Sequence, residues 1–318
     1  MKKIIENLKW RPRWVSHLGC IKGCLEYLNF DVSDAWLFGA TGHAFILNLH
    51  EIVCPSGPTA WNTEMLFKLG KNIGYTLDGV WGLKSSPDFA EKQKIAWEKT
   101  RQSIDQNLPC YGWELDLPEY YVVKGYDDKG YFFSGPGSDS GKKSKSWKEL
   151  GDSGIGVLEM WCVRLDQPSD EIQTIKQALE FALEHSGSPA KWIFPKYKAG
   201  LAGYDSWIQA IKSGSAHDFG MAYNAAVWAE CRKLAVDFLK EAQNKLGDRF
   251  KLLFEEATGH YEKVAQNLNE VSKLFPFPPK GNELKDTSRC EIARRCLRDA
   301  QKSEESGLKS LEKISSQL

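Results

Sequence analysis

The sequence lacks both a surplus of one charge and a long hydrophobic run. Its 42 basic and 42 acidic residues cancel, which removes the electrostatic basis for nucleic acid or an anionic membrane as the main partner. Basic residues open the chain, but no apolar segment follows them, so no signal peptide is expected. The most apolar stretch, residues 35–53, contains glycines, histidines and a glutamate and falls short of a membrane span. We therefore expect a cytoplasmic protein.

Motifs for bound cofactors and metals are also missing. No glycine-rich phosphate loop follows an expected strand, so no nucleotide cofactor is predicted. The cysteines do not form paired CxxC motifs and the histidines lack HxxxH spacing, so no metal site is predicted. Eight cysteines in 318 residues are too few for a disulfide framework, and free thiols are expected.

Aromatic residues, by contrast, are abundant. The chain has twelve Trp, eleven Tyr and fifteen Phe residues. Aromatic walls suit either a large core or a pocket for a flat or apolar ligand, and composition alone does not choose between the two.

The first half of the chain switches between helical and strand patterns. Helices are expected at about 16–28, 33–37 and 87–106, and another is expected to begin at residue 58 or 59. Strands are expected at 45–49, 110–115, 120–126, 131–134 and 157–165, with a hairpin turn at 127–130. Helices followed by antiparallel strands predict an α+β fold for this half.

From residue 167 the pattern is helical to the end. Apolar residues recur at steps of three and four in stripes within residues 172–182, 221–238 and 250–268, and a more polar helix is expected at about 284–314. The sequence thus predicts an α+β domain over residues 1–166 and an all-helical domain over residues 167–318.

Cys20 is the first candidate for chemistry. It falls near the start of an expected helix, where the helix dipole and unpaired N–H groups lower the pKa of a thiol. The alternative is that Cys20 and Cys24, four residues apart, are small apolar residues on a buried helix face.

Two segments resemble a known family. Residues 16–45, with Cys20 and the run Ser33-Asp34-Ala35-Trp36-Leu37-Phe38-Gly39, resemble the N-terminal domain of the butirosin biosynthesis protein H family, as does the run from Tyr120 to Asp128. That family is related in fold to papain-like peptidases that cleave double-glycine leader peptides. The resemblance covers about residues 14–165 and implies a papain-like domain with an antiparallel sheet and Cys20 at the nucleophile position.

The chain departs from the family pattern at other catalytic positions. Tyr120, or Tyr121 if the register shifts by one residue, stands where the relatives have the catalytic histidine, and Gly135 stands where they have the orienting aspartate before proline. No glutamine precedes Cys20 to complete an oxyanion hole. A thiol without an imidazole loses its general base and acid together, so ordinary papain-like proteolysis is not expected.

Other residues are candidates to complete such a site. His43 is the candidate base, the Tyr120 hydroxyl a candidate substrate contact, and His17 lies one helical turn before Cys20. Glu114 and Glu119 flank the strand that would carry the missing histidine, and burial of either would make it a base. Further candidate ligand contacts are Trp36, Trp61 and Cys54. Cys54 lies beside a rigid proline turn, and the alternative is that this turn only caps the next helix.

Two functions follow as expectations. One is a thiol-dependent transferase or hydrolase acting on a small acyl or amide substrate. The other is a catalytically inactive relative that binds a peptide or small metabolite in the same aromatic-lined cleft.

Overall fold

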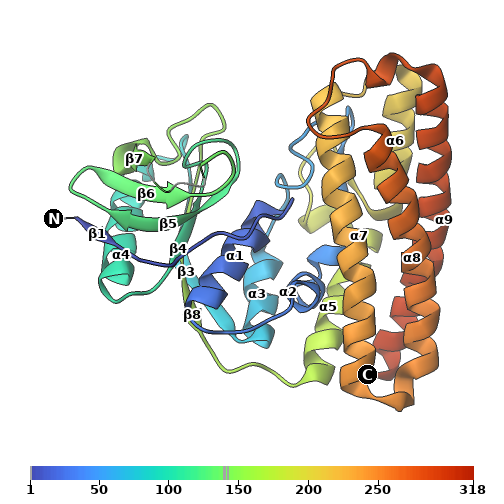
Figure 1. Cartoon of the computed structure of the whole chain (residues 1–318), viewed down its shortest axis with the longest axis horizontal. Coiled ribbons are helices and arrows are strands. Elements are labelled where there is room, and N and C mark those ends of the chain that lie inside the picture. Colours follow the sequence, from blue (N-terminus) through green and yellow to red (C-terminus); the bar gives the residue numbers. More distant parts are fainter. Residues whose placement is uncertain (1, 139–140, 142) are drawn as a thin grey trace. The chain divides into compact units, whose positions relative to one another are not determined.

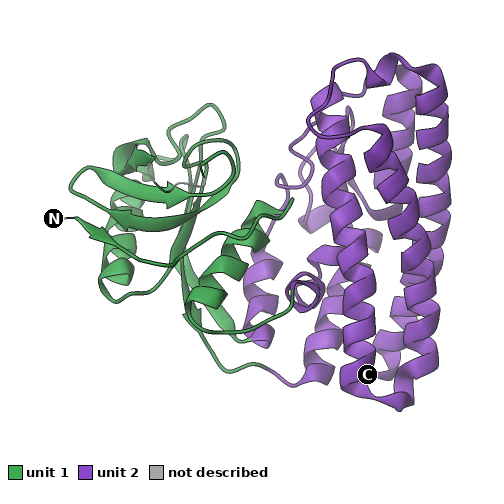
Figure 2. Cartoon of the chain, in the orientation of Figure 1, with its two compact units in different colours: residues 1–33, 74–168 green, residues 34–73, 169–318 purple. Residues whose placement is uncertain are grey.

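The structure, a computed structural model, describes residues 2–138, 141 and 143–318. The chain divides into two compact units (Figure 2). Unit 1 comprises residues 1–33 and 74–168, and unit 2 comprises residues 34–73 and 169–318. The expected division at residue 166 or 167 differs from this arrangement, because residues 34–73 belong with the helical part of the chain.

Unit 1 is an α+β unit (Figure 1). Within its described residues, an antiparallel sheet has the strand order β3-β8-β4-β5-β6-β7, with β1 pairing on β5. The strands are β1 (Lys3–Ile4), β3 (Tyr75–Leu83), β4 (Cys110–Trp113), β5 (Tyr120–Tyr126), β6 (Gly130–Ser134), β7 (Ser144–Ser146) and β8 (Val157–Leu165), and the helices are α1 (Ser16–Tyr27), α4 (Phe89–Asp105) and the 3-10 turn η2 (Trp147–Glu149).

Helices α1 and α4 cover opposite faces of this sheet. Side chains alternate between faces along a strand, and Tyr111 on β4 contacts His17 of α1. Its neighbour Cys110 lies against Cys162, whose sulfur is next to the Lys99 carbonyl of α4. The apolar side chains between each helix and the sheet form the core of unit 1.

Unit 2 is mainly helical, and among its longest helices α8 packs against both α7 and α9. The helices are α2 (Asp34–Ala40), α3 (Glu64–Ile73), α5 (Glu171–Gly187), α6 (Gly200–Ser213), α7 (Asp218–Leu246), α8 (Lys251–Leu274) and α9 (Thr287–Gln317). Short 3-10 turns are η1 (His43–Phe45), η3 (Pro189–Lys191), η4 (Asp248–Phe250) and η5 (Glu283–Lys285), and β2 (Asn48–His50) pairs with β9 (Tyr197–Ala199).

The core of unit 2 contains a buried ion pair. The Arg232 guanidinium on α7 donates to the Glu304 carboxylate on α9 at 2.7 Å, and both side chains are at most 2% exposed. Tyr204 on α6 donates its hydroxyl to the same carboxylate at 3.0 Å. Arg232 also donates to the carbonyls of Ala44 and Ile46, each at 2.8 Å. One charged side chain thereby joins α7 and α9 to the segment that contains η1.

Several expectations can be compared with these elements. The predicted α+β fold is confirmed for the chain, as is its helical C-terminal part, although that part also contributes the short strand β9. The strand expected at 45–49 differs, because residues 43–45 form η1 and pairing begins at Asn48. Gly42 precedes η1 with a φ of 74°, a left-handed conformation that glycine adopts without strain.

Candidate functional site

Polar side chains gather where α1 begins against β4, β5 and β8 of unit 1. Helix α1 packs on all three strands, and its first turns face the first residues of β5. We call this group the α1 cluster. Its members are Ser16, His17, Cys20, Tyr111, Glu119, Tyr120 and Glu159.

Ser16 joins the start of α1 to the start of β5. Its hydroxyl donates to the Glu119 carboxylate and accepts the backbone N–H of Tyr120 at 3.0 Å. Ser16 is only 3% exposed. The expected ligand contact Glu119 therefore has a hydroxyl partner inside the unit.

His17 is held between two tyrosines. Its Nε2 lies 2.8 Å from the Tyr111 hydroxyl, and its ring stacks on the ring of Tyr120 with the centroids 4.0 Å apart. All three side chains are buried. The imidazole that the sequence places one turn before Cys20 is thus oriented by Tyr111 and Tyr120.

Tyr120, the first residue of β5, is fixed by Glu159 on β8. The Tyr120 hydroxyl and the Trp161 indole N–H both donate to the same oxygen of the Glu159 carboxylate, each at 3.0 Å. Burial raises the pKa of Glu159, and burial together with the neighbouring carboxylate raises the pKa of the Tyr120 phenol well above its usual value. Tyr120 remains a protonated donor and cannot serve as a base near neutral pH.

Cys20 lies one turn into α1 and is fully buried. Burial, with smaller contributions from Cys24 and Glu119, raises the pKa of its thiol well above the usual value. A nucleophilic cysteine needs a lowered pKa and partial exposure. The helix start that was expected to favour the thiolate is therefore outweighed by desolvation.

The expected base His43 belongs to unit 2, whereas Cys20 belongs to unit 1. His43 Nδ1 lies 3.7 Å from the sulfur of Cys231, and its ring contacts Trp61 edge to face. Burial lowers the pKa of His43 to about 4, and the positive charge of Arg232 also acts in that direction. His43 is thus a neutral core histidine of unit 2.

Three other expected contacts also lie in unit 2 with structural partners. Trp61 is buried and donates its indole N–H to Pro58 O at 3.1 Å. Trp36 packs on Phe238, with Lys245 Nζ 4.6 Å from the centre of its ring. The backbone carbonyl of Cys54 accepts an amide N–H from Asn224 at 3.0 Å.

Glu114 remains in unit 1 but takes part in a different set of contacts. Its carboxylate accepts the Ser153 hydroxyl at 2.7 Å, and its carbonyl accepts Lys145 Nζ at 3.0 Å. Of the expected site residues, the α1 cluster brings together Cys20, His17, Glu119 and Tyr120. Glu159 was not foreseen, because nothing in the spacing of residues 120 and 159 indicates contact between β5 and β8.

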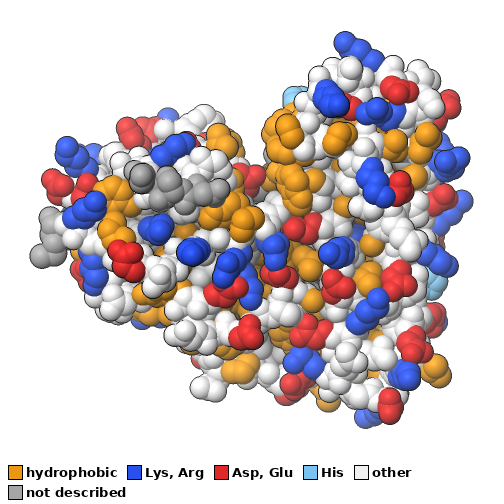
Figure 3. All heavy atoms as spheres, viewed as in Figure 1, with side chains coloured by type: hydrophobic (Ala, Val, Ile, Leu, Met, Phe, Trp, Pro, Cys, Tyr) orange, Lys and Arg blue, Asp and Glu red, His pale blue; other side chains and the backbone are white. Residues whose placement is uncertain are grey.

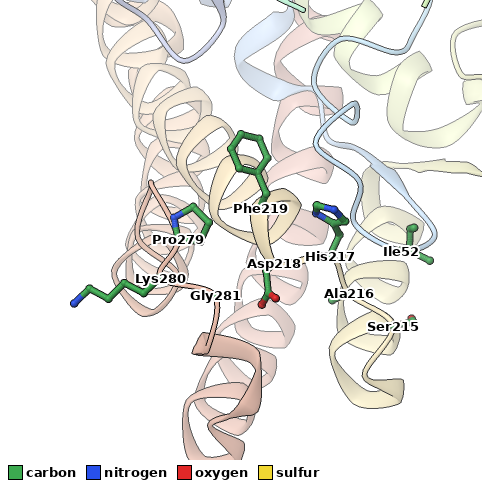
Figure 4. A pocket seen from close by; sticks show the side chains of 9 residues that line it. All are labelled: Ile52, Ser215, Ala216, His217, Asp218, Phe219, Pro279, Lys280 and Gly281. Atoms are coloured by element: carbon green, nitrogen blue, oxygen red, sulfur yellow. The ribbon is translucent and has the colours of Figure 1, made fainter. Parts of the chain in front are cut away.

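A second candidate site is a hollow of about 540 Å³ where α7 begins in unit 2 (Figure 4). The residues around it are Ile52, Ser215, Ala216, His217, Asp218, Phe219, Pro279, Lys280 and Gly281. Three separate segments supply them, so no local motif could have indicated the hollow from the sequence.

The wall of the hollow is partly aromatic. Phe219 is 43% exposed, stacks on Tyr223 with the centroids 6.2 Å apart, and meets Phe277 edge to face at 5.3 Å. In Figure 3, hydrophobic side chains gather at the end of unit 2 where α7 begins. Exposed rings held by ring neighbours form a preorganised apolar surface.

Polar groups of the hollow come from the first turn of α7 and from the segment after α8. His217 Nδ1 accepts the backbone N–H of Gly220 at 3.1 Å, which leaves Nε2 as the protonated ring nitrogen in the neutral form. Asp218 is exposed in the first helical turn. In Figure 4 the side chain of Lys280 extends away from Phe219 and His217.

Across residues 2–138, 141 and 143–318, no group of three or more His, Cys, Asp or Glu side chains could hold a metal ion, and no helix is long and apolar enough to cross a membrane. No protein-family model matches the chain, and no curated protein matches it. The resemblance of residues 14–165 to the butirosin biosynthesis protein H family therefore stays a prediction.

Proposed function

We propose that this chain is a ligand-binding protein whose papain-like unit 1 has no thiol chemistry. The arrangement of unit 1 supports a papain-like identity, because α1 carries Cys20 against an antiparallel sheet beside Tyr120, the first residue of β5. The observation that carries the proposal is the environment of Cys20, which is buried and protonated, beside a tyrosine in place of a histidine.

The ligand we propose is a small molecule or short peptide that carries an apolar group and a basic nitrogen, bound in the hollow of unit 2. Its volume of about 540 Å³ falls in the range of small-molecule pockets. Phe219 and Ile52 offer exposed apolar surface, and the Asp218 carboxylate supplies the negative charge for a cation. An aromatic face also attracts cations. The eight free thiols support a cytoplasmic location.

Alkylation of Cys20 tests the first half of the proposal. Iodoacetamide added to the native protein should modify Cys20 at least about 10³-fold more slowly than in the unfolded chain, because only rare opened molecules expose it. The partly exposed Cys54 and Cys290 provide internal references in the same digest. Fast modification of Cys20 with a pH midpoint below that of a free thiol would refute the proposal.

Fast modification would favour a second candidate function, thiol-dependent acyl transfer. One observation supports that alternative: His17, Glu119 and Tyr120 surround the same end of α1 as Cys20. In this case replacing His17 with Gln should slow the alkylation of Cys20, since the imidazole would be assisting the thiol.

Ligand binding is tested with defined probes. Phenethylamine and the dipeptide Phe-Arg should raise the melting temperature and give saturation-transfer NMR signals, whereas phenylpropionate, which lacks the cation, should not. Phe219→Ala and Asp218→Asn should abolish both effects. Phe194→Ala removes a 50% exposed phenylalanine of unit 2 outside the hollow and should leave binding intact. Equal binding by Phe219→Ala, or no binding of any probe, would overturn the assignment.

A further inference from the structure

Two buried cysteines lie side by side on adjacent strands of the sheet of unit 1. Cys110 on β4 and Cys162 on β8 are direct partners in the antiparallel register. The thiol of Cys110 donates to the sulfur of Cys162, and the two sulfur atoms are 3.0 Å apart. Neither residue belongs to the α1 cluster, because both side chains lie on the α4 face of the sheet.

The backbone at this position suits a disulfide. At the next pair along, the backbone N–H of Val163 donates to Pro109 O at 2.9 Å. Hydrogen-bonded and non-hydrogen-bonded pairs alternate in an antiparallel ladder, so Cys110 and Cys162 form a non-hydrogen-bonded pair. Such pairs have Cα atoms about 4.5 Å apart, within the range of about 4.4–6.8 Å that a disulfide requires.

From this geometry we propose that Cys110 and Cys162 form a redox modification site. Peroxide oxidises the two thiols to a cross-strand disulfide, and thiols reduce that disulfide again. This inference does not rest on the proposed ligand-binding function. The sulfur atoms need to approach by only about 1 Å to reach the disulfide bond length, so neither strand has to move far.

The chemistry balances with a peroxide as the two-electron oxidant. The Cys162 sulfur attacks hydrogen peroxide, one oxygen is transferred to give a sulfenic acid, and water leaves after proton transfer. The Cys110 sulfur then attacks that sulfenic sulfur, the sulfur–sulfur bond forms, and a second water leaves with the Cys110 proton. The hydrogen bond from Cys110 lowers the pKa of Cys162, which supports Cys162 as the first sulfur to react.

The burial of the pair determines how fast it reacts. Cys110 is not exposed and Cys162 is 2% exposed, and the sulfur of Cys162 lies 3.9 Å from the Lys99 carbonyl of α4. A peroxide molecule therefore reaches the sulfur when α4 opens locally. Oxidation of this pair should be slower than oxidation of the partly exposed Cys54, and it should end at the disulfide because the second thiol is already in contact.

A matched cysteine pair lies in the same unit. Cys20 and Cys24 are also fully buried and are four residues apart on α1. Side chains at this spacing have Cβ atoms about 5–6 Å apart, beyond the separation of about 3.8 Å found in disulfides. Cys20 and Cys24 should therefore not link under conditions that link Cys110 and Cys162.

The test uses the purified full chain treated with hydrogen peroxide and then unfolded in N-ethylmaleimide. We expect Cys110 and Cys162 to escape alkylation and to appear in a joined peptide whose mass is two hydrogen atoms below the sum of its two reduced peptides. Dithiothreitol should restore both thiols. The oxidised protein should unfold at a higher urea concentration, because the bond closes a long loop.

The variants separate this pair from the others. Cys162→Ala should lose the cross-linked peptide, and Cys20→Ala should retain it. The peptide map of the unsubstituted protein decides the question even where a variant fails to fold. Full alkylation at all eight cysteines after peroxide treatment would overturn the proposal, as would a map in which the link joins other cysteines or Cys162 is oxidised to sulfinic acid without a link.

Discussion

Replacing Glu304 with Gln measures how far the stability of unit 2 depends on its buried ion pair. The substitution keeps the size of the side chain but removes the negative charge that faces Arg232, and both side chains are at most 2% exposed. Arg232 would keep its two carbonyl partners. The positive charge of Arg232 would then be buried without a negative partner, and water could not reach it to replace that partner.

The expected cost follows from this geometry. Removing one partner of a buried ion pair costs about 3–5 kcal/mol. A glutamine oxygen can still accept from Arg232 or from Tyr204, so we expect a loss near the lower end, about 3 kcal/mol of the free energy of unfolding. Urea unfolding followed by circular dichroism and by tryptophan fluorescence measures this loss.

The neighbouring residue provides the control. Glu305 lies next to Glu304 on α9 but pairs with Lys309 in solvent, where the two side chains are 54% and 68% exposed. Glu305→Gln should cost no more than about 0.5 kcal/mol. A cost for Glu304→Gln within about 1 kcal/mol of the control would contradict the inference that Arg232 depends on this carboxylate.

Two more predictions concern the packing of unit 2. Burial lowers the pKa of His43 to about 4 and the pKa of His185 to about 3, from 6.5. As the pH falls below 6.5, both histidines are therefore protonated in the unfolded chain before they are protonated in the folded protein. Each histidine should thus lower the free energy of unfolding by about 2 kcal/mol at pH 5. Urea unfolding at pH 7 and pH 5 checks this, and His43→Gln should remove about half of the difference. A Cβ on Gly39 would lie 1.9 Å from the Phe238 ring, whereas a Cβ on Gly259 would meet nothing within 4 Å. In thermal unfolding, Gly39→Ala should therefore destabilise the protein by about 1–3 kcal/mol, and Gly259→Ala should stabilise it by up to about 1 kcal/mol. Unchanged stability in Gly39→Ala would mean that α2 can move away from α7.

The elements that the sequence predicted best are those with a strong local pattern. The expected strand at 157–165 and the helix at 87–106 match β8 and α4 closely. The buried residues of α4 recur at helical steps of three and four, and β8 is a short run rich in apolar residues that is buried on both faces of the sheet. Strand β3 and helix α6 were not predicted. Strand β3 contains Gly79 and Gly82, and it forms because all nine of its residues pair with β8, a long-range contact that local propensity does not contain.

The candidate site shows the same limit. The helix at Cys20 and the strand that begins at Tyr120 were each expected from sequence, and the resemblance suggested that they meet. The carboxylate that holds Tyr120 comes from Glu159 on β8. Strand β4 separates β8 from β5 in the sheet, so no local pattern in the sequence indicates that Glu159 and Tyr120 meet. The burial that raises the pKa of Cys20 is likewise a property of the packed unit, and the position of a thiol near a helix start does not reveal it.

The placement of residues 34–73 has a physical cause that bears on the function of His43. Arg232 on α7 binds the carbonyls of Ala44 and Ile46, directly after His43, and Phe238 on the same helix packs against Gly39. A buried guanidinium needs several fixed acceptors, so the segment around His43 is part of the electrostatic core of unit 2. The backbone that directly follows His43 is therefore held by α7, and the His43 ring itself packs against Trp61 and lies next to the sulfur of Cys231. These contacts within unit 2 account for the burial that lowers the pKa of His43.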